Sequence, residues 1–136
     1  MRDPLPSLPG YALRRAANAT AAELSGRLNG LGLRQSDVSV LILVAENPGV
    51  TASAVGRALD IQRANMVPLL NRLEDLGLIE RAPIDKKSRG LALTPLGAEQ
   101  LAVARAVIET FEADLLARVP PEHRPHLLPA LEALWR

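Results

Sequence analysis

A short β-hairpin between helical stretches is the feature of this sequence that most restricts its fold. The helical pattern of residues 62–76 ends at Gly77, and two short runs with apolar residues in alternation follow at 78–81 and 91–93. Alternation with a period of two, bounded by turn residues, is typical of strands that pair as a hairpin. The sequence therefore predicts a mainly α-helical fold that contains one small β-hairpin.

Four helical stretches are expected before the hairpin. Apolar residues recur at three- and four-residue spacing along 11–31, which predicts an amphipathic helix. The stretch 35–46 is apolar nearly all round and is expected to be the buried central helix. Residues 52–59 are expected to form a short helix with a threonine N-cap, and a tight turn joins it to the helix at 62–76.

Two further helices are expected after the hairpin. A threonine N-cap followed by a proline predicts a helix over 95–118. Apolar residues at alternating spacings of three and four along 101–115 form a seam that favours packing along another helix. A last apolar helical stretch either begins at Pro125 or is kinked by its prolines. The prolines of residues 1–10 predict an extended arm at the start of the chain.

The order of these elements is that of a winged helix-turn-helix, in which two short helices are preceded by a third and followed by a hairpin. Such proteins place the first residues of the second short helix in the major groove of DNA. Glutamine and asparagine can pair with adenine, arginine with guanine, and an alanine methyl can contact thymine. The residues expected to read bases are Gln62, Arg63, Ala64 and Asn65. Ser53 and Arg57 on the preceding helix are both candidates for phosphate contacts, and exposed helix polarity explains both equally well.

The hairpin loop carries a cluster of cations. The net charge of the whole chain is only +1, so a nucleic-acid-binding face must be locally basic. Lys86, Lys87 and Arg89 are expected at the tip of the hairpin, where they can contact phosphates or a minor groove beside the recognition helix. Asp85 is expected to fold the loop by pairing with Lys87.

The segment Thr51 to Gly97, and more loosely the whole chain, resembles the MarR (multiple-antibiotic-resistance regulator) family of transcriptional regulators. The strongest match is LLNRLEDLGLIERAPIDKKSRGLALTPLG, which is similar to the end of that family's recognition helix, its wing and its capped dimer helix. The family's wing carries an Asp-x-Arg motif. Here Lys87 stands where the arginine is usual, and lysine keeps the positive charge but cannot bind in the bidentate way of arginine.

Pro68 stands where many members have a polar or basic residue. The branch with a similar stretch senses hydroperoxides through a cysteine, which this chain lacks.

The resemblance implies a homodimer built by helices at both chain ends. The chain 1–136 is then a single domain, with dimerisation helices at 11–31 and 95–136 and a winged helix-turn-helix lobe at 34–94. A symmetric dimer of this kind is expected to act as a ligand-responsive repressor on a pseudo-palindromic operator in double-stranded DNA. The residues expected at the dimer interface are Leu13, Leu24, Leu101, Ile108, Phe111, Leu115, Leu131 and Trp135.

The resemblance also implies a small aromatic or phenolic effector, bound between the dimer helices and the winged lobe. The sequence offers no polar cluster that identifies this effector. Tyr11 and Arg14 are the candidates for a wall of its pocket.

Several other classes of function have little support in the sequence. The chain has no cysteine, which excludes disulfides and cysteine-ligated metals. His123 and His126 are spaced for chelation but lack a third ligand, so no metal and no cofactor are expected. The sequence shows no phosphate loop and no nucleophile–histidine pairing, so an enzyme is not expected. The apolar runs are too short for a membrane span, and a cytoplasmic protein without membrane contact is predicted.

One rival interpretation keeps the same fold. In it the chain is a dimeric winged-helix adaptor that binds protein and has no specific DNA binding. The low net charge and the lysine in the wing motif favour it. A steep salt dependence of DNA binding distinguishes the two, because only a DNA-binding protein releases counterions from the duplex.

Overall fold

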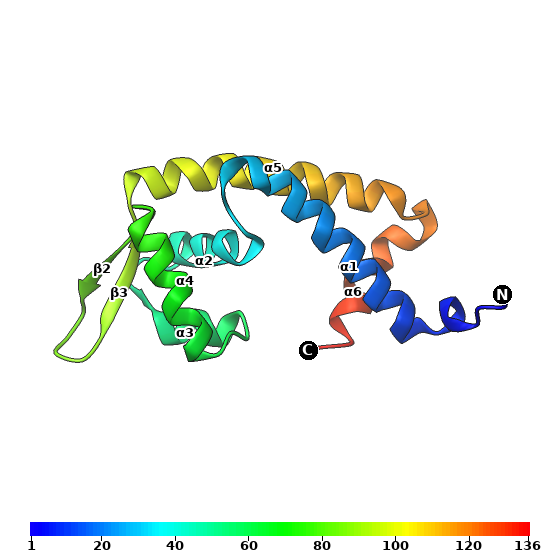
Figure 1. The fold of residues 1–136 in the computed structure, drawn as a ribbon, viewed down its shortest axis with the longest axis horizontal. Helices are drawn as coiled ribbons and strands as arrows, with labels where there is room; N and C mark the ends of the chain where they lie inside the picture. The colour runs from blue at the N-terminus through cyan, green and yellow to red at the C-terminus, as the bar shows by residue number, and fades with distance from the viewer. The chain divides into compact units, whose positions relative to one another are not determined.

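The structure of the chain, a computed structural model, describes all 136 residues, and helices make up most of it (Figure 1). The α-helices are α1 (Pro9–Leu28), α2 (Gln35–Glu46), α3 (Ala52–Ala58), α4 (Arg63–Asp75), α5 (Pro95–Arg118) and α6 (Arg124–Glu132). The strands are β1 (Val50–Thr51), β2 (Ile79–Pro83) and β3 (Arg89–Leu93). Three short 3-10 turns are η1 (Leu5–Ser7), η2 (Asn29–Leu31) and η3 (Pro121–His123). The expected mainly helical fold with a small hairpin is confirmed.

The chain divides into two compact units. The central unit is Ser25–Arg105, and the terminal unit combines Met1–Leu24 with Ala106–Arg136. The central unit is larger than the expected lobe at 34–94, because it includes the end of α1 and the first turns of α5. Leu28 and Leu101, which lie in these added segments, are both buried.

The core of the central unit is aliphatic. Helix α2 is buried on most sides, as its nearly continuous apolar sequence predicts, and α4 buries one stripe of residues at helical spacing. The fully enclosed side chains of this unit include Leu28, Val38, Val40, Leu41, Val44, Val55, Leu73, Ile79 and Leu91. Truncating one such leucine or isoleucine to alanine costs about 2–5 kcal/mol of stability, so this core fixes α4 against α2.

The hairpin belongs to a three-stranded antiparallel sheet with strand order β1-β3-β2. Strands β2 and β3 pair in the register Ile79↔Leu93 to Pro83↔Arg89, which confirms the hairpin and lengthens both of its strands. Strand β1 was not expected from the sequence, because two residues are too few to show an alternating pattern. Its pairing, Val50↔Leu91, brings the backbones so close that a Cβ on Gly90 would lie 2.8 Å from the carbonyl oxygen of Gly49.

Thr94 fixes the first turn of α5 to the segment that ends α4. Its hydroxyl oxygen accepts a hydrogen bond from the backbone N–H of Gly97 at 2.9 Å, which is the expected N-cap, and its hydroxyl donates to the carbonyl of Gly77. The Thr94 backbone N–H donates to the carbonyl of Leu78 at 3.1 Å. The first turn of α5 is therefore hydrogen-bonded to the segment that directly follows α4.

Near the chain ends, the N-terminal arm differs from the expectation, whereas one alternative for the last helix, a start at Pro125, agrees with the structure to within one residue. Residues 1–10 are not uniformly extended, because η1 forms and α1 begins at Pro9. The last helix begins at Arg124, one residue before Pro125, and continues through Pro129. The Arg124 guanidinium closes the α5–α6 connection, with hydrogen bonds to the carbonyls of Val119 at 2.8 Å and Ala117 at 3.0 Å.

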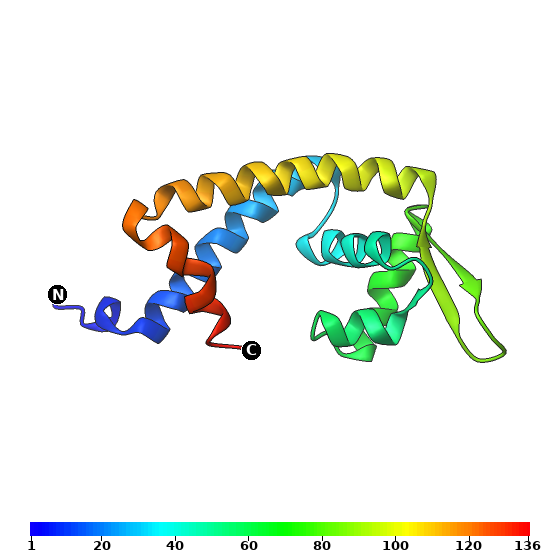
Figure 2. The same ribbon diagram turned by 180° about the vertical axis from the view of Figure 1, so that it is seen from behind.

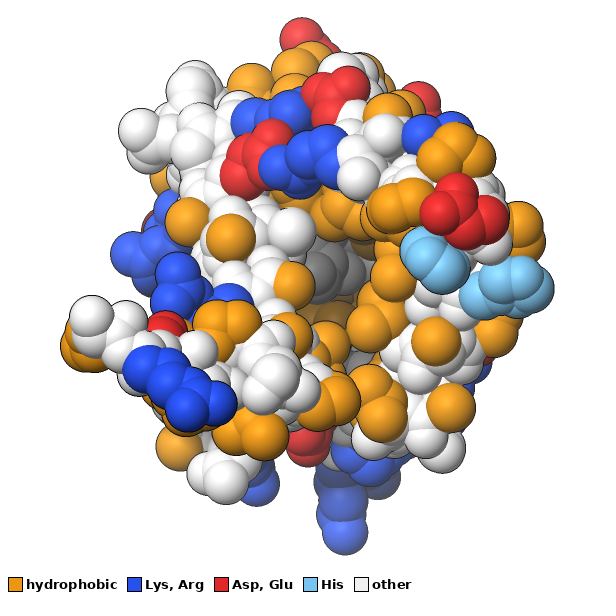
Figure 3. Space-filling view, turned by 90° about the vertical axis from the view of Figure 1, so that its right-hand side faces the viewer, with side chains coloured by type: hydrophobic (Ala, Val, Ile, Leu, Met, Phe, Trp, Pro, Cys, Tyr) orange, Lys and Arg blue, Asp and Glu red, His pale blue; other side chains and the backbone are white.

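The terminal unit has almost no core of its own within one chain. Of the sixteen buried apolar residues in the chain, only Phe111 lies in this unit. An ion pair between Arg118 and Glu23, at 2.8 Å, joins α5 to α1. Figure 3 shows many hydrophobic side chains exposed on the face that it views. None of the helices combines the length and apolar character needed to cross a bilayer.

Candidate nucleic-acid interface

Helices α3 and α4 form the helix-turn-helix of the central unit. The Thr51 hydroxyl accepts a hydrogen bond from the Ala54 N–H at 3.2 Å and caps α3, as expected. The turn after α3 closes with a hydrogen bond from the Ile61 N–H to the Gly56 carbonyl at 2.8 Å, and Asp60 adopts a left-handed backbone conformation with φ 52°. Helix α4 then starts with Gln62 as its N-cap.

The Gln62 side chain makes no capping hydrogen bond. Only its backbone carbonyl takes part in the helix start, where it accepts from the N–H groups of Asn65 at 2.9 Å and Met66 at 3.0 Å. The Gln62 amide is exposed and is therefore available to an external partner. The same is true of Arg63 and Asn65, which are exposed on the first turn of α4.

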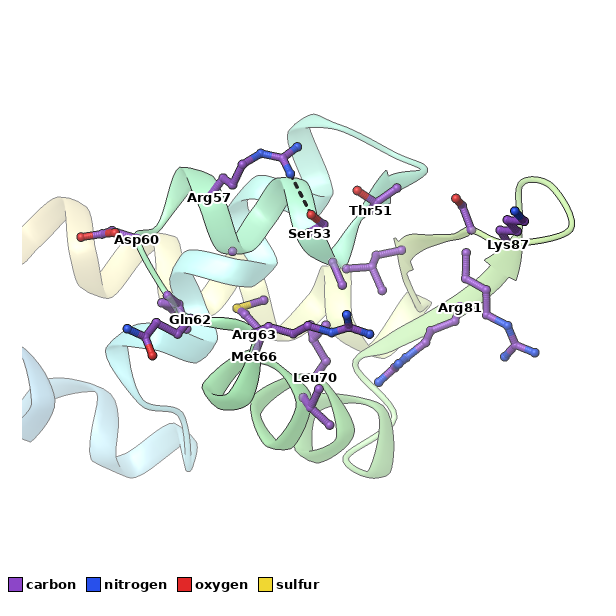
Figure 4. Close-up of a pocket in the computed structure, with 17 residues that line it drawn as sticks. Thr51, Ser53, Arg57, Asp60, Gln62, Arg63, Met66, Leu70, Arg81 and Lys87 are labelled. Carbon is purple, nitrogen blue, oxygen red and sulfur yellow. Dashed lines mark hydrogen bonds between the residues drawn. The ribbon is translucent and has the colours of Figure 1, made fainter.

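A groove of about 770 Å³ lies between the helix-turn-helix and the hairpin (Figure 4). Figures 1 and 2 show the amino-terminal end of α4 and the hairpin tip at the same edge of the central unit. Apolar side chains of α4 and β3 line part of this groove, and polar and charged side chains line the rest. The charged residues of its lining are Arg57, Asp60, Arg63, Arg81, Lys87 and Arg89.

The cations of the groove are largely uncompensated. Five cationic side chains line it against the single carboxylate of Asp60. Among these cations, Arg81 forms an ion pair with Glu74 at 2.7 Å, whereas Arg57 is bound only to the Ser53 hydroxyl, at 2.7 Å. The other three, Arg63, Lys87 and Arg89, have no side-chain partner within the chain. The groove is thus strongly positive on a chain whose net charge is +1, and it suits a polyanion.

The wing loop spans residues 84–88 and is ordered by Asp85. The Asp85 carboxylate accepts hydrogen bonds from the backbone N–H groups of Lys87 at 2.7 Å and Ser88 at 2.8 Å. These two N–H groups, that of Lys87 first, hold the pKa of the Asp85 carboxyl below its ordinary value. The structure corrects the expected Asp85–Lys87 pairing, because the contact is made by the Lys87 backbone, and the Lys87 ammonium remains free.

Arg89 also lies elsewhere than expected. It is the first residue of β3 and pairs with Pro83, so it stands at the base of the loop and not at the hairpin tip. The physical reason is that the strands extend two residues beyond the apolar runs that mark them in the sequence. Arg89 nevertheless lines the groove.

The eight residues predicted to contact DNA fall into two sets. Five of the eight line the groove: Ser53, Gln62, Arg63, Lys87 and Arg89. The other three are exposed outside its lining: Ala64, Asn65 and Lys86. Arg81 also lines the groove and was not predicted, and so does Arg57, which like Ser53 was an open candidate for a phosphate contact. Arg81 was missed because it reads as an ordinary strand residue, although its two-residue spacing from buried Ile79 places both on one face of β2.

The residues predicted for the effector pocket, Tyr11 and Arg14, belong to the terminal unit and are not among the residues that line the groove. The Tyr11 hydroxyl accepts a hydrogen bond from Arg15 at 3.0 Å, and the Arg14 guanidinium lies 5.5 Å from the centre of the Tyr11 ring. The three side chains form a small cationic cluster around one phenol. No group of three or more His, Cys, Asp or Glu side chains is placed to hold a metal ion.

The predicted dimer contacts also divide into two sets. Leu101 and Phe111 are each only 4% exposed within the single chain, so little of either side chain is left for a partner. Both side chains are already covered within the single chain, and their place at a dimer interface stays a prediction. Leu13, Leu131 and Trp135 are exposed, and Leu24, Ile108 and Leu115 are half-buried.

The helix-turn-helix, the paired hairpin and the basic groove between them define a winged-helix DNA-binding protein. Comparisons with known proteins identify the family of winged-helix proteins to which the chain is similar. A sequence model of the MarR family matches residues 30–90. A protein of Thauera aromatica described as a transcriptional regulatory protein for the hcr operon is 31% identical over 130 residues, which cover 93% of this chain and 78% of the relative.

Solved structures agree with this match. The repressor CouR bound to a 23-mer DNA duplex has a TM-score of 0.88 and 33% identity, with 97% of this chain and 95% of that chain covered. CouR bound to p-coumaroyl-CoA has a TM-score of 0.90 and 31% identity, with 100% and 97% covered. The MarR-family protein Rv2887 of Mycobacterium tuberculosis in complex with DNA has a TM-score of 0.76 and 27% identity, with 95% and 98% covered. The chain belongs to the MarR family of transcriptional regulators.

Proposed function

We propose that this chain is a homodimeric, ligand-responsive repressor whose central unit binds a pseudo-palindromic operator through the groove between α4 and the wing. Gln62, Arg63 and Asn65 read bases in the major groove, and Ala64 adds an apolar contact. Ser53 and the wing cations Lys86, Lys87 and Arg89 contact the sugar-phosphate backbone. Asp85 keeps the wing loop in the shape that presents these cations.

The observation that carries this proposal is the uncompensated charge of the groove. Arg57, Arg63, Lys87 and Arg89 line one surface, and none of them has an acidic partner within the chain. Three arginines elsewhere in the chain are paired with carboxylates: Arg72 with Asp37, Arg105 with Glu46 at 2.7 Å and Arg118 with Glu23 at 2.8 Å. Unpaired cations gathered beside an exposed helix start suit the phosphates on either side of a major groove. An adaptor that binds only protein has no evident need for this arrangement.

The proposed homodimer is supported by the composition of the terminal unit. Nine of the fourteen large apolar side chains that are exposed in one chain lie in this unit, including Leu13, Leu128, Leu131, Leu134 and Trp135. A unit with one buried apolar residue and this much exposed apolar surface gains its core from a second copy. In this division the terminal unit holds the dimer together, and the central units bind the two half-sites.

The proposed effector class is supported by two relatives. CouR has been solved with p-coumaroyl-CoA and Rv2887 with salicylic acid, and both ligands carry a phenolic ring. Tyr11 and Arg14 remain the proposed contacts for such a ligand in this chain, because a guanidinium can bind an acidic or phenolic oxygen while the tyrosine ring packs against the aromatic ring. Thr94 gives a route for the response, because it links the first turn of α5 to the end of α4.

Selection of DNA sites from a random duplex library tests the proposed function. The proposal predicts a consensus with two inverted half-sites about one helical turn apart. Fluorescence anisotropy with the selected duplex is then expected to show selective binding that weakens steeply with salt. A library that returns no consensus, together with equal and weak binding of unrelated duplexes, favours the adaptor.

A further inference from the structure

The first two turns of the recognition helix α4 carry apolar side chains on their solvent-exposed face. Val67 is 51% exposed, and Ala64 and Pro68 are exposed beside it. One half-exposed valine beside an exposed alanine and an exposed proline gives the proposed DNA-facing side of the helix a continuous apolar surface that the chain itself leaves open to solvent. This inference rests on the proposed function, since it concerns what the same surface recognises.

Helical geometry places these residues on the side of α4 opposite to its buried residues. The buried residues of α4 are Met66, Leu70 and Leu73. At about 100° per residue, Ala64 and Pro68 point almost directly away from that stripe, and Val67 lies between them and the groove. We call Ala64, Val67 and Pro68 the apolar strip.

Polar residues flank this strip on both sides. On the helical wheel Arg63 lies on the side of Val67, and Asn65 lies beyond Pro68. Val67 also lines the basic groove, and Arg63 and Met66 belong to the same lining. The strip is therefore continuous with the positively charged surface of the groove. That charge favours a nucleic acid as the partner that covers the strip.

Duplex DNA offers few apolar groups to such a strip. In the major groove the one apolar group at the base edges is the 5-methyl of thymine, which apolar side chains contact directly. We infer that the apolar strip of α4, with Val67 as its main contact, selects operators that place thymine methyl groups opposite the first two turns of the helix. Arg63 and Asn65 read the neighbouring base pairs on either side.

Pro68 fits this role for a second reason. Proline has no backbone N–H and leaves the carbonyl of residue 64 without its usual helical donor. The helix nevertheless continues from Arg63 to Asp75 with Pro68 inside it. The ring adds apolar surface at the centre of the outward face and carries no donor or acceptor that could prefer another base.

Atom-level changes in the DNA test the inference directly. Each thymine of the selected operator is replaced by deoxyuridine, which removes only the methyl group, and affinity is measured by anisotropy. The expected loss is about fourfold for each methyl that becomes buried, and roughly fifteenfold when the symmetric positions of both half-sites are changed. The same titrations are run with Val67→Thr, which keeps the branched shape but replaces a methyl by a hydroxyl. That variant is expected to lose most of the preference for thymine over deoxyuridine.

Val103→Thr is the matched control. Val103 is an exposed valine of α5, 46% exposed, and it does not line the groove. The ratio of affinities for thymine and deoxyuridine operators is expected to equal that of the wild type, whatever this variant does to dimerisation.

Two results overturn the inference while leaving the proposed function intact. One is selective operator binding in which no single deoxyuridine replacement weakens affinity. The other is a thymine preference that Val67→Thr leaves unchanged, since the methyl group is then read elsewhere. Failure to select any operator instead overturns the proposed function itself.

Discussion

The Asp37 carboxylate is wholly buried and forms an ion pair with the Arg72 guanidinium across 35 residues of sequence. Asp37 stands in the first turn of α2, where it also accepts a hydrogen bond from the Arg34 backbone N–H at 2.7 Å. Arg72 stands near the end of α4 and donates a second hydrogen bond to the Gly32 carbonyl at 3.0 Å. One side chain thus fixes the recognition helix to both α2 and the segment that enters it from α1.

Removal of either partner is expected to destabilise the central unit unequally. Arg72→Met leaves a wholly buried carboxylate without its counter-ion, and about 3–5 kcal/mol of unfolding free energy is expected to be lost. Asp37→Asn is expected to cost less, because the Arg72 side chain is 31% exposed and water can solvate it. Urea unfolding of both variants measures the difference. Equal losses below about 1 kcal/mol contradict the structural role assigned to the pair.

Gly97 is expected to tolerate no side chain. A Cβ at this position would overlap the carbonyl oxygen of Leu78, where α5 begins against the end of the α4–β2 connection. Gly97→Ala is expected to cost at least about 3 kcal/mol, because backbone atoms on both sides must move. Gly26→Ala is the control, since a Cβ there meets nothing within 4 Å, and a gain of up to about 1 kcal/mol is expected from replacing a glycine within the last turn of α1. Thermal unfolding that ranks the two variants in the opposite order contradicts this packing.

The wing loop is expected to loosen only in acid. The ionised Asp85 carboxylate accepts the Lys87 and Ser88 N–H groups, and its pKa in the folded chain is lowered. The stabilisation is therefore fully present above the ordinary pKa of aspartate and is lost as the pH falls through the lowered value. Amide chemical shifts of Lys87 and Ser88, followed by NMR from neutral pH downward, report this transition. A midpoint at or above the ordinary aspartate pKa contradicts the prediction, and Asp85→Ala is expected to abolish the transition.

A charge placed in the exposed apolar surface of the terminal unit is expected to break the dimer. Leu131→Asp introduces a carboxylate where the proposed interface is apolar, and burial of an unpaired carboxylate is strongly unfavourable. Sedimentation velocity is expected to show the wild type as a dimer and this variant as a monomer. Ile84→Asp, on the wing loop of the central unit, also replaces a large exposed apolar residue and is expected to remain dimeric. Dissociation of both variants, or of neither, argues against this interface.

The elements of the fold that depend on local pattern were predictable from the sequence. The spacing of apolar residues predicted the six helices, and the threonine caps Thr51 and Thr94 were predicted from their place before helical stretches. Strand β1 was not predictable, because its two residues are defined only by their pairing with β3.

Relationships between distant residues were not predictable by the same means. The pairing of Asp37 with Arg72 has no signal in sequence spacing, and the position of Arg81 in the groove depends on how β2 packs beside α4. Leu101 and Phe111 carried the pattern of a helix seam, which is the same whether the covering surface comes from one chain or from a partner. The exposed face of α4 can be identified only when its buried residues are known. The place of Val67 on that face therefore came from the structure.

The salt dependence of operator binding tests the role of the groove most directly. Lys87→Gln/Arg89→Gln removes two unpaired groove cations from each protomer, both proposed to contact phosphate, and Arg2→Gln/Arg136→Gln removes two exposed cations of the terminal unit as a control. Anisotropy titrations at several salt concentrations give the slope of log affinity against log salt. The groove variant is expected to lose about 3–4 units of that slope per dimer, at roughly 0.9 for each lost phosphate contact, while the control keeps the wild-type slope. A groove variant that binds the operator with the wild-type affinity and slope contradicts DNA binding through this surface.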